Sequence, residues 1–471
     1  MSKSPFLRTP AHVSRQGMTL VEMLIATTIT LIIMAAVAEV FGLFGAGVSD
    51  SRAVIEMTDQ MRSASYRLRQ DLAGATAPTL PPLAPEQELG YFEYIEGPAS
   101  DTNAAFGSLV GATDATSLTA DCDDVLLFTT RSAGAPFTGR FGSGTLESPA
   151  AEVAWFCELS DTQVPGGPTL FTLYRRQLLV TAYAGVTPFE DNGTNSVAWP
   201  GSWQDFYASY DLSCRLDAAA GVLRPNTLGD LTKRESRFLH NLTGADAFPF
   251  ITNVIPADVR EVATGETLGT NTSGTIDRTG EDVLLTNVLA FDVRAFDPNA
   301  TIRTRAGAVD AVTPGDPGFA AASPDVARGA YVDLNWLRNT SPTAFPLAAG
   351  TTFPATGASA FSGLGVQVLA NAGAANLLAH SLDTTRTTAT YDTWSTHYDA
   401  DGFDQDGRDG ADQGTDGFDT DGDGAVDEAD ERETSAPYPV ALRGIEIRIR
   451  CYEPSSRQIR QVTVRHTFVP H

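Results

Sequence analysis

The chain has 471 residues, and at roughly 150 residues per domain we expect more than one structural unit. Apolar residues make up 42% of the sequence, which is enough for a substantial core. The 58 acidic and 32 basic residues leave a net charge of -26, which repels phosphate backbones, so nucleic acid is not an expected partner. Lys3 and Lys233 are the only lysines, and no Gly-rich loop ends in Lys-Ser or Lys-Thr, which argues against nucleotide hydrolysis.

The N-terminal 48 residues carry the strongest pattern in the sequence. Residues 1–17 are polar and basic, and an apolar run from Met18 to Val48 follows, interrupted by Glu22 and Glu39. This run is long enough to cross a bilayer as a helix, which takes about 20 residues. Because the basic flank lies before it, we expect the N-terminus inside and the rest of the chain exported.

Glu22 is the unusual residue of this run, because a carboxylate within a membrane helix costs a few kcal/mol and needs a partner. The stretch Gly17-Met18-Thr19-Leu20-Val21-Glu22 resembles the class III leader of type IV prepilins and type II secretion pseudopilins. The resemblance implies cleavage after Gly17 by prepilin peptidase, N-methylation of Met18, and a role for Glu22 in assembly. The new α-amino group of Met18 would then pair with Glu22 of a neighbouring subunit.

An ordinary secretory signal is the alternative for this segment, with Ala36-Val37-Ala38 as its cleavage site. The charge of Glu22 inside the apolar stretch argues against it.

A second helical pattern follows the apolar run. Apolar residues recur every three or four positions at Val54, Met57, Met61, Ala64, Leu68 and Leu72. A continuous helix from Met18 to Leu72 would span roughly 80 Å. A Pro-rich stretch within residues 75–88 then ends the helix.

From residue 89 onward the pattern favours strands separated by Gly, Pro, Asp and Asn turns. The predicted strands are 91–95, 125–130, 152–157, 170–179, 283–296 and 331–337, with a C-terminal hairpin that turns at Pro454-Ser455-Ser456. We expect surface loops at 185–203, 260–280 and 300–328. The predicted fold class is therefore α+β, with one long N-terminal helix and a mainly antiparallel sheet.

These patterns divide the chain into seven predicted segments. They are a leader (1–17), a transmembrane helix (18–48), an amphipathic stalk helix (49–74), a Pro-rich linker (75–88), a β-rich head (89–398), an acidic segment (399–433) and a C-terminal hairpin (434–471).

The acidic segment predicts a calcium site. Between Asp399 and Glu433 the chain has 15 acidic residues and 2 arginines. Within it, residues 419–430 fit a twelve-residue calcium loop in which Gly424 permits the sharp turn and Val426 packs inward. The predicted Ca²⁺ ligands are Asp419, Asp421, Asp423, the carbonyl of Ala425, Asp427 and Asp430.

An internal repeat supports this prediction, because Asp401-Gly402-Phe403-Asp404-Gln405-Asp406-Gly407 recurs 15 residues later. The first copy has Arg408 where the fifth-position ligand belongs. It could form a second, weaker site through Asp401, Asp404 and Asp406. The alternative for the whole segment is a solvated acidic loop without metal.

The cysteines and histidines give weaker signals. Cys157 and Cys451 alternate with apolar residues, so we expect them to be buried, whereas Cys122 and Cys214 could pair if the chain is exported. The histidines are scattered and no nucleophile motif is present, so we expect no enzymatic activity.

The sequence therefore predicts a minor pilin or pseudopilin subunit in a type II secretion pseudopilus or a type IV pilus-like fibre. Residues 67–72 and 173–176 and the closing hairpin also resemble J-type pseudopilins and W-type minor pilins. The expected partners are the bacterial inner membrane, prepilin peptidase and other pilin subunits, with the head in the periplasm or outside the cell. The alternative is a single-pass, calcium-dependent binding or adhesion protein.

Overall fold

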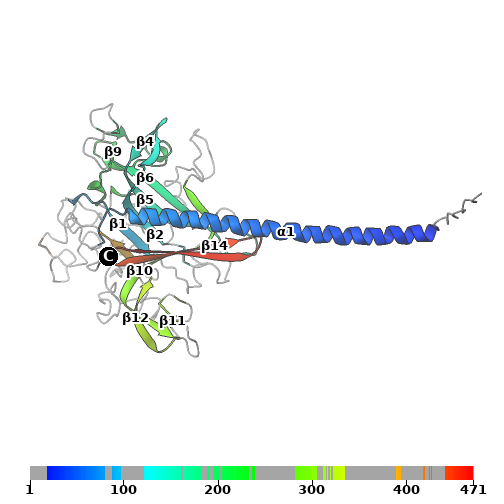
Figure 1. The fold of residues 1–471 in the computed structure, drawn as a ribbon. Helices are drawn as coiled ribbons and strands as arrows, with labels where there is room; N and C mark the ends of the chain where they lie inside the picture. The colour runs from blue at the N-terminus through cyan, green and yellow to red at the C-terminus, as the bar shows by residue number, and fades with distance from the viewer. Residues whose placement is uncertain are drawn as a thin grey trace, which may run out of the picture. The chain divides into compact units, whose positions relative to one another are not determined.

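The computed structural model describes residues 19–79, 87–96, 121–238 and 282–334 with short gaps, 389–393 and 441–469, and the single positions 417, 418, 424 and 426. The chain forms two compact units, Met1–Glu56 and Met57–His471. The fold class is α+β as predicted, with one long helix, α1 (Leu20–Ala73), ahead of a mainly antiparallel sheet (Figure 1).

In the N-terminal unit, helix α1 exposes its apolar side chains. Leu20 is 81% exposed and Phe41 is 72% exposed, and the helix continues without a break through Gly42, Gly45 and Gly47. An 18-residue window of this helix has a mean hydropathy of 2.3, so its length and composition make it a candidate membrane span. A signal sequence near an N-terminus has the same properties.

The second unit is built on a ten-stranded sheet. Its main path runs β13-β1-β2-β5-β6-β10-β14-β15, and β11 and β12 pair with β10. The strands are β1 (Phe92–Glu96), β2 (Val125–Arg131), β5 (Ala150–Leu159), β6 (Phe171–Val180), β10 (Val283–Thr304), β11 (Ala311–Val312), β12 (Asp325–Val332), β13 (Ala389–Asp392), β14 (Gly444–Glu453) and β15 (Gln458–Thr467).

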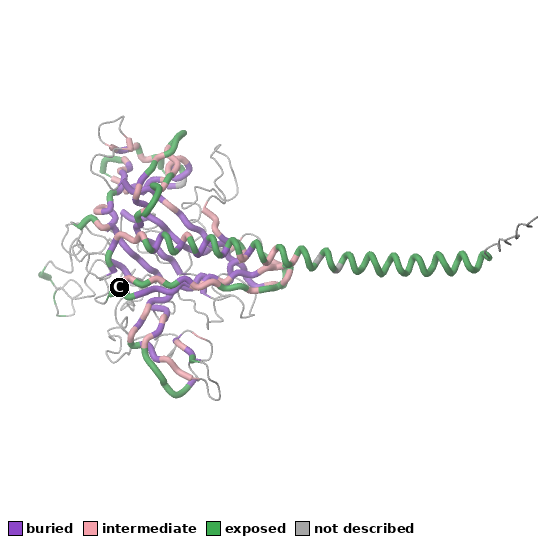
Figure 2. Tube along the Cα trace, in the orientation of Figure 1, coloured by how far each residue is buried: buried purple, intermediate pink, exposed green. Residues whose placement is uncertain are grey.

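The central strands are buried on both faces, as Figure 2 shows in purple. Six of the seven residues of β2 are buried in succession, a pattern that requires a covering layer on each side of the sheet. Leu126 belongs to one hydrophobic cluster and Leu127 to the other, because neighbouring side chains of a strand point to opposite faces.

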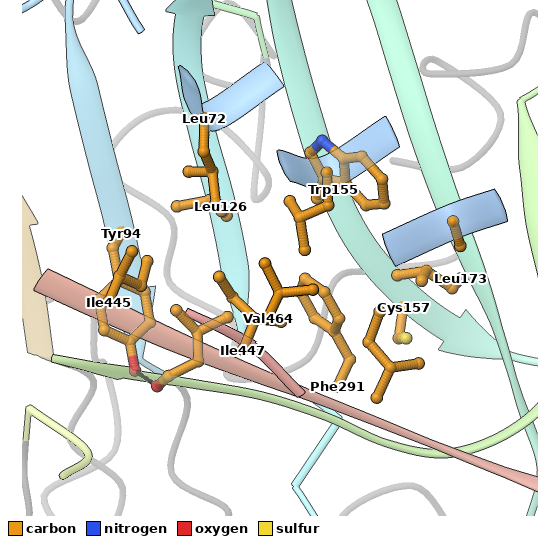
Figure 3. Close-up of a cluster of buried hydrophobic side chains, with 14 of the residues drawn as sticks. Leu72, Tyr94, Leu126, Trp155, Cys157, Leu173, Phe291, Ile445, Ile447 and Val464 are labelled. Atoms are coloured by element: carbon orange, nitrogen blue, oxygen red, sulfur yellow. Dashed lines mark hydrogen bonds between the residues drawn. The ribbon is translucent and has the colours of Figure 1, made fainter. Parts of the chain in front are cut away.

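The C-terminal part of α1 covers one face. Its buried residues are Met57, Met61, Ala64, Leu68 and Leu72, which follow the predicted helical spacing. They join a cluster with Leu126 of β2, Trp155 of β5 and Ile447 of β14, some of whose side chains Figure 3 shows. Tyr94 of β1 donates a hydrogen bond to the carbonyl of Val293 in the same layer.

Short elements cover the opposite face. They are β3 (Phe137–Phe141), β4 (Gly144–Ser148), β7 (Val197–Ala198), α3 (Trp203–Tyr207), β8 (Cys214–Asp217), β9 (Val222–Pro225) and the 3-10 helix η3 (Asp230–Thr232). Aromatic residues dominate the packing, and Trp203 stacks on Tyr207 with ring centroids 5.6 Å apart. Phe156 of β5 and Leu178 of β6 belong to this second cluster.

Asp71, in the last turns of α1, joins the helix to the centre of the sheet. Its carboxylate accepts hydrogen bonds from Arg175 of β6 at 2.6 and 2.9 Å, and a third from Nε1 of Trp155 at 3.1 Å. Asp71 and Arg175 are both buried, so the ion pair is screened little by water.

Gly74 ends the helix where the chain passes very close to β2. A Cβ atom at this position would lie 2.1 Å from the carbonyl oxygen of Arg131 and 2.5 Å from Oγ1 of Thr130. Only glycine therefore permits the hydrogen bond from the amide of Arg131 to the carbonyl of Gly74, at 2.8 Å.

Five predicted strands, 91–95, 125–130, 152–157, 170–179 and 283–296, coincide with observed strands, as does the hairpin of β14 and β15. The bounds of the predicted strand 331–337 were wrong, because β12 runs from Asp325 to Val332 and overlaps it at two residues. The loop prediction for 300–328 was also wrong. Strand β10 continues to Thr304 and pairs with β12, and the many Gly, Ala and Thr residues of the range 300–328 hid this pairing from the periodicity.

Cys157 and Cys451 are buried as predicted, and the possible pairing of Cys122 with Cys214 is not formed. All four cysteines are buried and free. Cys122 belongs to the cluster under helix α1, whereas Cys214 belongs to the cluster on the opposite face, so the sheet separates the two thiols. Burial raises the pKa of Cys214 well above its ordinary value and that of Cys451 to about 12, so both remain thiols at neutral pH.

We predict that Asp71→Asn lowers the free energy of unfolding by about 3 to 5 kcal/mol, because it leaves the guanidinium of Arg175 buried without its countercharge. Scanning calorimetry of the full chain in detergent micelles measures the change. Asp59→Asn is the matched control, because Asp59 pairs with Arg62 at 3.2 Å and its side chain is 63% exposed. Equal losses in the two variants would contradict an anchoring role for Asp71.

Candidate functional site

The predicted processing site lies at the start of the described chain. Gly17 and Met18 are outside the described residues, whereas Glu22 lies in the first turn of α1. The sequence predicted a charged partner for Glu22 on a neighbouring subunit. The structure adds partners that Glu22 finds within its own helix.

Glu22 and Thr19 form a reciprocal cap at the N-terminus of α1. The backbone amide and the hydroxyl of Thr19 donate to Oε2 of Glu22 at 2.8 and 3.1 Å. The amide of Glu22 donates to Oγ1 of Thr19 at 3.3 Å. This is a capping box, in which a Thr and the Glu three residues later satisfy amides that the helix leaves unpaired. The negative charge of Glu22 also lies at the positive end of the helix dipole.

The hydroxyl groups of three threonines in the apolar stretch donate hydrogen bonds to backbone carbonyls of the same helix. Thr28 and Thr30 donate to the carbonyls of Leu24 and Ala26 at 2.7 Å, and Thr27 donates to that of Met23 at 3.0 Å. A hydroxyl that bonds to the preceding turn needs no water, so these residues are compatible with a hydrocarbon environment.

The predicted calcium ligands lie outside the described residues. These are Asp419, Asp421, Asp423, Ala425, Asp427 and Asp430, together with Asp401, Asp404 and Asp406 of the first repeat. Of the loop itself, Gly424 has a φ of +100°, in the region that glycine adopts readily. Val426 is 52% exposed, which differs from the inward packing that we predicted for it.

A cluster of three buried aspartates lies elsewhere in the head, where the sequence analysis did not predict a site. Carboxylate oxygens of Asp121, Asp124 and Asp292 all lie within 4.8 Å of one another. Oδ2 of Asp124 accepts the amide of Val293 at 2.6 Å, and the carbonyl of Asp121 accepts that of Phe291 at 2.8 Å. These contacts hold Asp121 and Asp124 against β10.

Arginines balance part of this negative charge. Nε of Arg294 donates to both oxygens of Asp292 at 2.9 Å and lies 3.4 Å from Asp333. Carboxylate oxygens are the ligand type of hard cations such as Ca²⁺. The hydrogen bonds from Val293 to Asp124 and from Phe291 to Asp121 give these two aspartates a structural role in joining their segment to β10.

A second buried network lies at the other end of the sheet. Nη1 of Arg237 lies 3.0 Å from Glu93 of β1 and 2.9 Å from Asp392 of β13, and its guanidinium stacks 4.1 Å over the ring of Tyr91. Glu152 of β5 accepts hydrogen bonds from Tyr91, Ser213 and the amide of Phe238. Burial raises the pKa of Glu152 above its ordinary value.

The sequence carried only a faint signal of these networks. Asp292 and Arg294 alternate with apolar residues in β10, and Glu93 does so in β1. Such alternation ordinarily indicates a strand with one solvated face. Here further segments cover that face, so the charged side chains are buried and pair with one another.

Comparison with known proteins identifies a motif in the N-terminal segment that contains the Thr19–Glu22 cap. Residues 13–38 match the family model of the prokaryotic N-terminal methylation motif. No curated protein and no solved structure matches the chain. The matched segment covers Gly17, Met18 and the Thr19–Glu22 cap, and it supports a type IV pilin-like protein that prepilin peptidase processes.

Proposed function

We propose that this chain is a minor pilin or pseudopilin that assembles into a type II secretion pseudopilus or a type IV pilus-like fibre. The observation that carries the proposal is the methylation motif at residues 13–38, at the start of a single long apolar helix among the described residues. A head of about 400 residues is much larger than a major subunit needs, which favours a minor subunit.

The function follows from the physical properties of the two units. The apolar surface of α1 is compatible with storage in the inner membrane before assembly, and afterwards with packing against equivalent helices. The head, exported to the periplasm or beyond, supplies an interaction surface. In this proposal the subunit performs no chemistry, and its partners are prepilin peptidase and other pilin subunits.

We predict that the mature protein begins at an N-methylated Met18, because the resemblance of residues 17–22 to a prepilin leader implies cleavage after Gly17. Intact-mass and N-terminal analysis of protein purified from membranes measures this. Gly17→Val should retain the leader, whereas Gly42→Val, the same change beyond the motif, should be processed normally. A start at Glu39 would indicate a secretory signal, and an intact Met1 would leave a simple membrane anchor, so either result would contradict the proposal.

The capping box allows a sharper test of Glu22. Glutamine can replace glutamate in a capping box, but it carries no charge. If Glu22 pairs with the α-amino group of Met18 in a neighbouring subunit, Glu22→Gln and Glu22→Ala should both be cleaved yet reduce incorporation into cross-linked fibres about tenfold or more, equivalent to about 1.4 kcal/mol.

Glu39→Ala is the control, because it removes the other carboxylate of the apolar stretch. Normal incorporation of Glu22→Gln together with loss in Glu22→Ala would show that capping alone matters. Normal incorporation of both variants would favour the alternative of a membrane-anchored calcium-dependent binding protein, which needs no partner for Glu22 on a neighbouring subunit.

We also propose that residues 419–430 bind a structural Ca²⁺ ion. The spacing of carboxylates at Asp419, Asp421 and Asp423 supports it, and so does the positive φ of Gly424 at the sixth loop position. The ion would neutralise part of a strongly self-repelling segment that leads into strand β14.

Isothermal titration of the full chain in detergent should therefore detect Ca²⁺ with a Kd of roughly 0.1 to 1 mM, as for extracellular calcium modules. Asp419→Ala/Asp423→Ala should abolish the binding. Glu431→Ala/Glu433→Ala is the control, because it removes the same charge from the acidic segment just beyond the twelve-residue loop. Equal weakening in both double variants would indicate diffuse attraction of counterions, and no binding at millimolar Ca²⁺ would refute the site.

A further inference from the structure

Strand β15 lies at one edge of the large sheet as the structure describes it. It has ten residues, and within the described part of the chain β14 is its only neighbour. One side of an edge strand carries backbone amides and carbonyls that can accept another strand. A long edge of this kind is a site for strand addition unless side chains oppose it.

The charge of this edge differs from that of the rest of the protein. Residues 454–471 contain Arg457, Arg460 and Arg465 and no acidic residue, in a chain whose net charge is -26. Arg443, which precedes β14, lies near the other end of the same edge, because the amide of Phe468 donates to its carbonyl at 3.0 Å. The edge is therefore a basic strip on an acidic molecule.

Within the described part of the chain, three exposed arginines near this edge have no acidic partner. Arg465 is neutralised by Glu446, which lies 2.5 Å away. Among the described residues, by contrast, no ion pair involves the exposed side chains of Arg443, Arg457 and Arg460, and Arg460 donates only to the neutral Gln458 at 2.9 Å.

The arginines also determine which strand the edge can accept. Two copies of β15 paired with each other would bring like charges together, which disfavours pairing between identical edges. Between Arg460 and Arg465 the side chains of β15 point alternately to the two faces of the sheet. Val462 and Val464 lie on the core side and Thr463 lies on the other. β-Branched residues of this kind favour similar residues across a strand pair.

We propose that the β15 edge binds an extended, acidic segment of a partner protein, which adds to the sheet as a further strand. The segment would carry carboxylates near its ends, opposite the basic residues, and β-branched residues between them. Main-chain hydrogen bonds give the affinity and the arginines select the charge. The inference does not depend on the role of the chain in a fibre.

The test uses hydrogen exchange on the full chain in detergent micelles. The probe is a ten-residue peptide with two aspartates at each end and alternating valine and threonine between them. The expected result is slower exchange of amides in residues 458–467 on addition of the peptide. Arg457→Gln/Arg460→Gln should weaken binding about fivefold, and raising the salt concentration should weaken binding to the unaltered chain.

Two controls separate strand addition from simple charge attraction. Arg131→Gln/Arg328→Gln removes two exposed arginines from other strands and should leave binding unchanged. A peptide of the same composition, N-methylated at alternate amides along its pairing edge, should not bind, because it cannot complete the ladder.

Four results would overturn the proposal. They are no binding, equal binding of the N-methylated peptide, equal weakening by the control variant, and full protection of the β15 amides before peptide is added. Vesicles of phosphatidylglycerol and phosphatidylcholine provide a further arm. Binding to these vesicles that requires Arg457 and Arg460, without binding of the peptide, would identify a lipid surface as the partner and would also overturn it.

Discussion

The contact of Asp71 with Arg175 and Trp155 is the constraint on which the packing of the head depends. It fixes the last turns of α1 over the middle of the sheet, where β5 and β6 pair. With the helix end held there, Met57, Met61, Ala64, Leu68 and Leu72 meet the apolar face in a single register. The close passage of Gly74 beside Arg131 then directs the chain away from the sheet.

The covering of both sheet faces explains why the head contains so many buried charges. A strand such as β10 has an apolar side toward α1, and its other side is covered by residues that the helix does not contact. Charged side chains on that side lose water, so each must find an opposite charge. Arginine suits this setting because its guanidinium stays charged and offers several donors in one plane, as Arg237 and Arg294 illustrate.

Glu22 caps its own helix and, in the proposed fibre, would also pair with a neighbouring subunit. Within its own helix the carboxylate satisfies the amide and hydroxyl of Thr19, which lowers the cost of a charge near the membrane. Thr19 bonds to Oε2, so a cation from a neighbouring subunit would not have to displace it. An ionised carboxylate has two oxygens and can accept several hydrogen bonds.

The sequence by itself determined the features that depend on local chemistry. Residues 13–38 carry a contiguous motif. Apolar residues recur at helical spacing in α1, and apolar and polar residues alternate on both sides of the Pro454-Ser455-Ser456 turn, which predicts the closing hairpin. Glu22 was found in the same way, from the residues next to it in the chain. The calcium proposal also rests on a local pattern, the spacing of the aspartates in 419–430.

Only the tertiary structure decided which distant residues meet. Asp71 and Arg175 are 104 residues apart, and Arg237 meets Asp392 across 155 residues, so no local period reports these pairs. The same holds for the cysteines, since Cys122 and Cys214 are equally buried but lie on opposite faces of the sheet. Periodicity shows which face of an element is apolar, but the order of strands in the sheet decides what that face contacts.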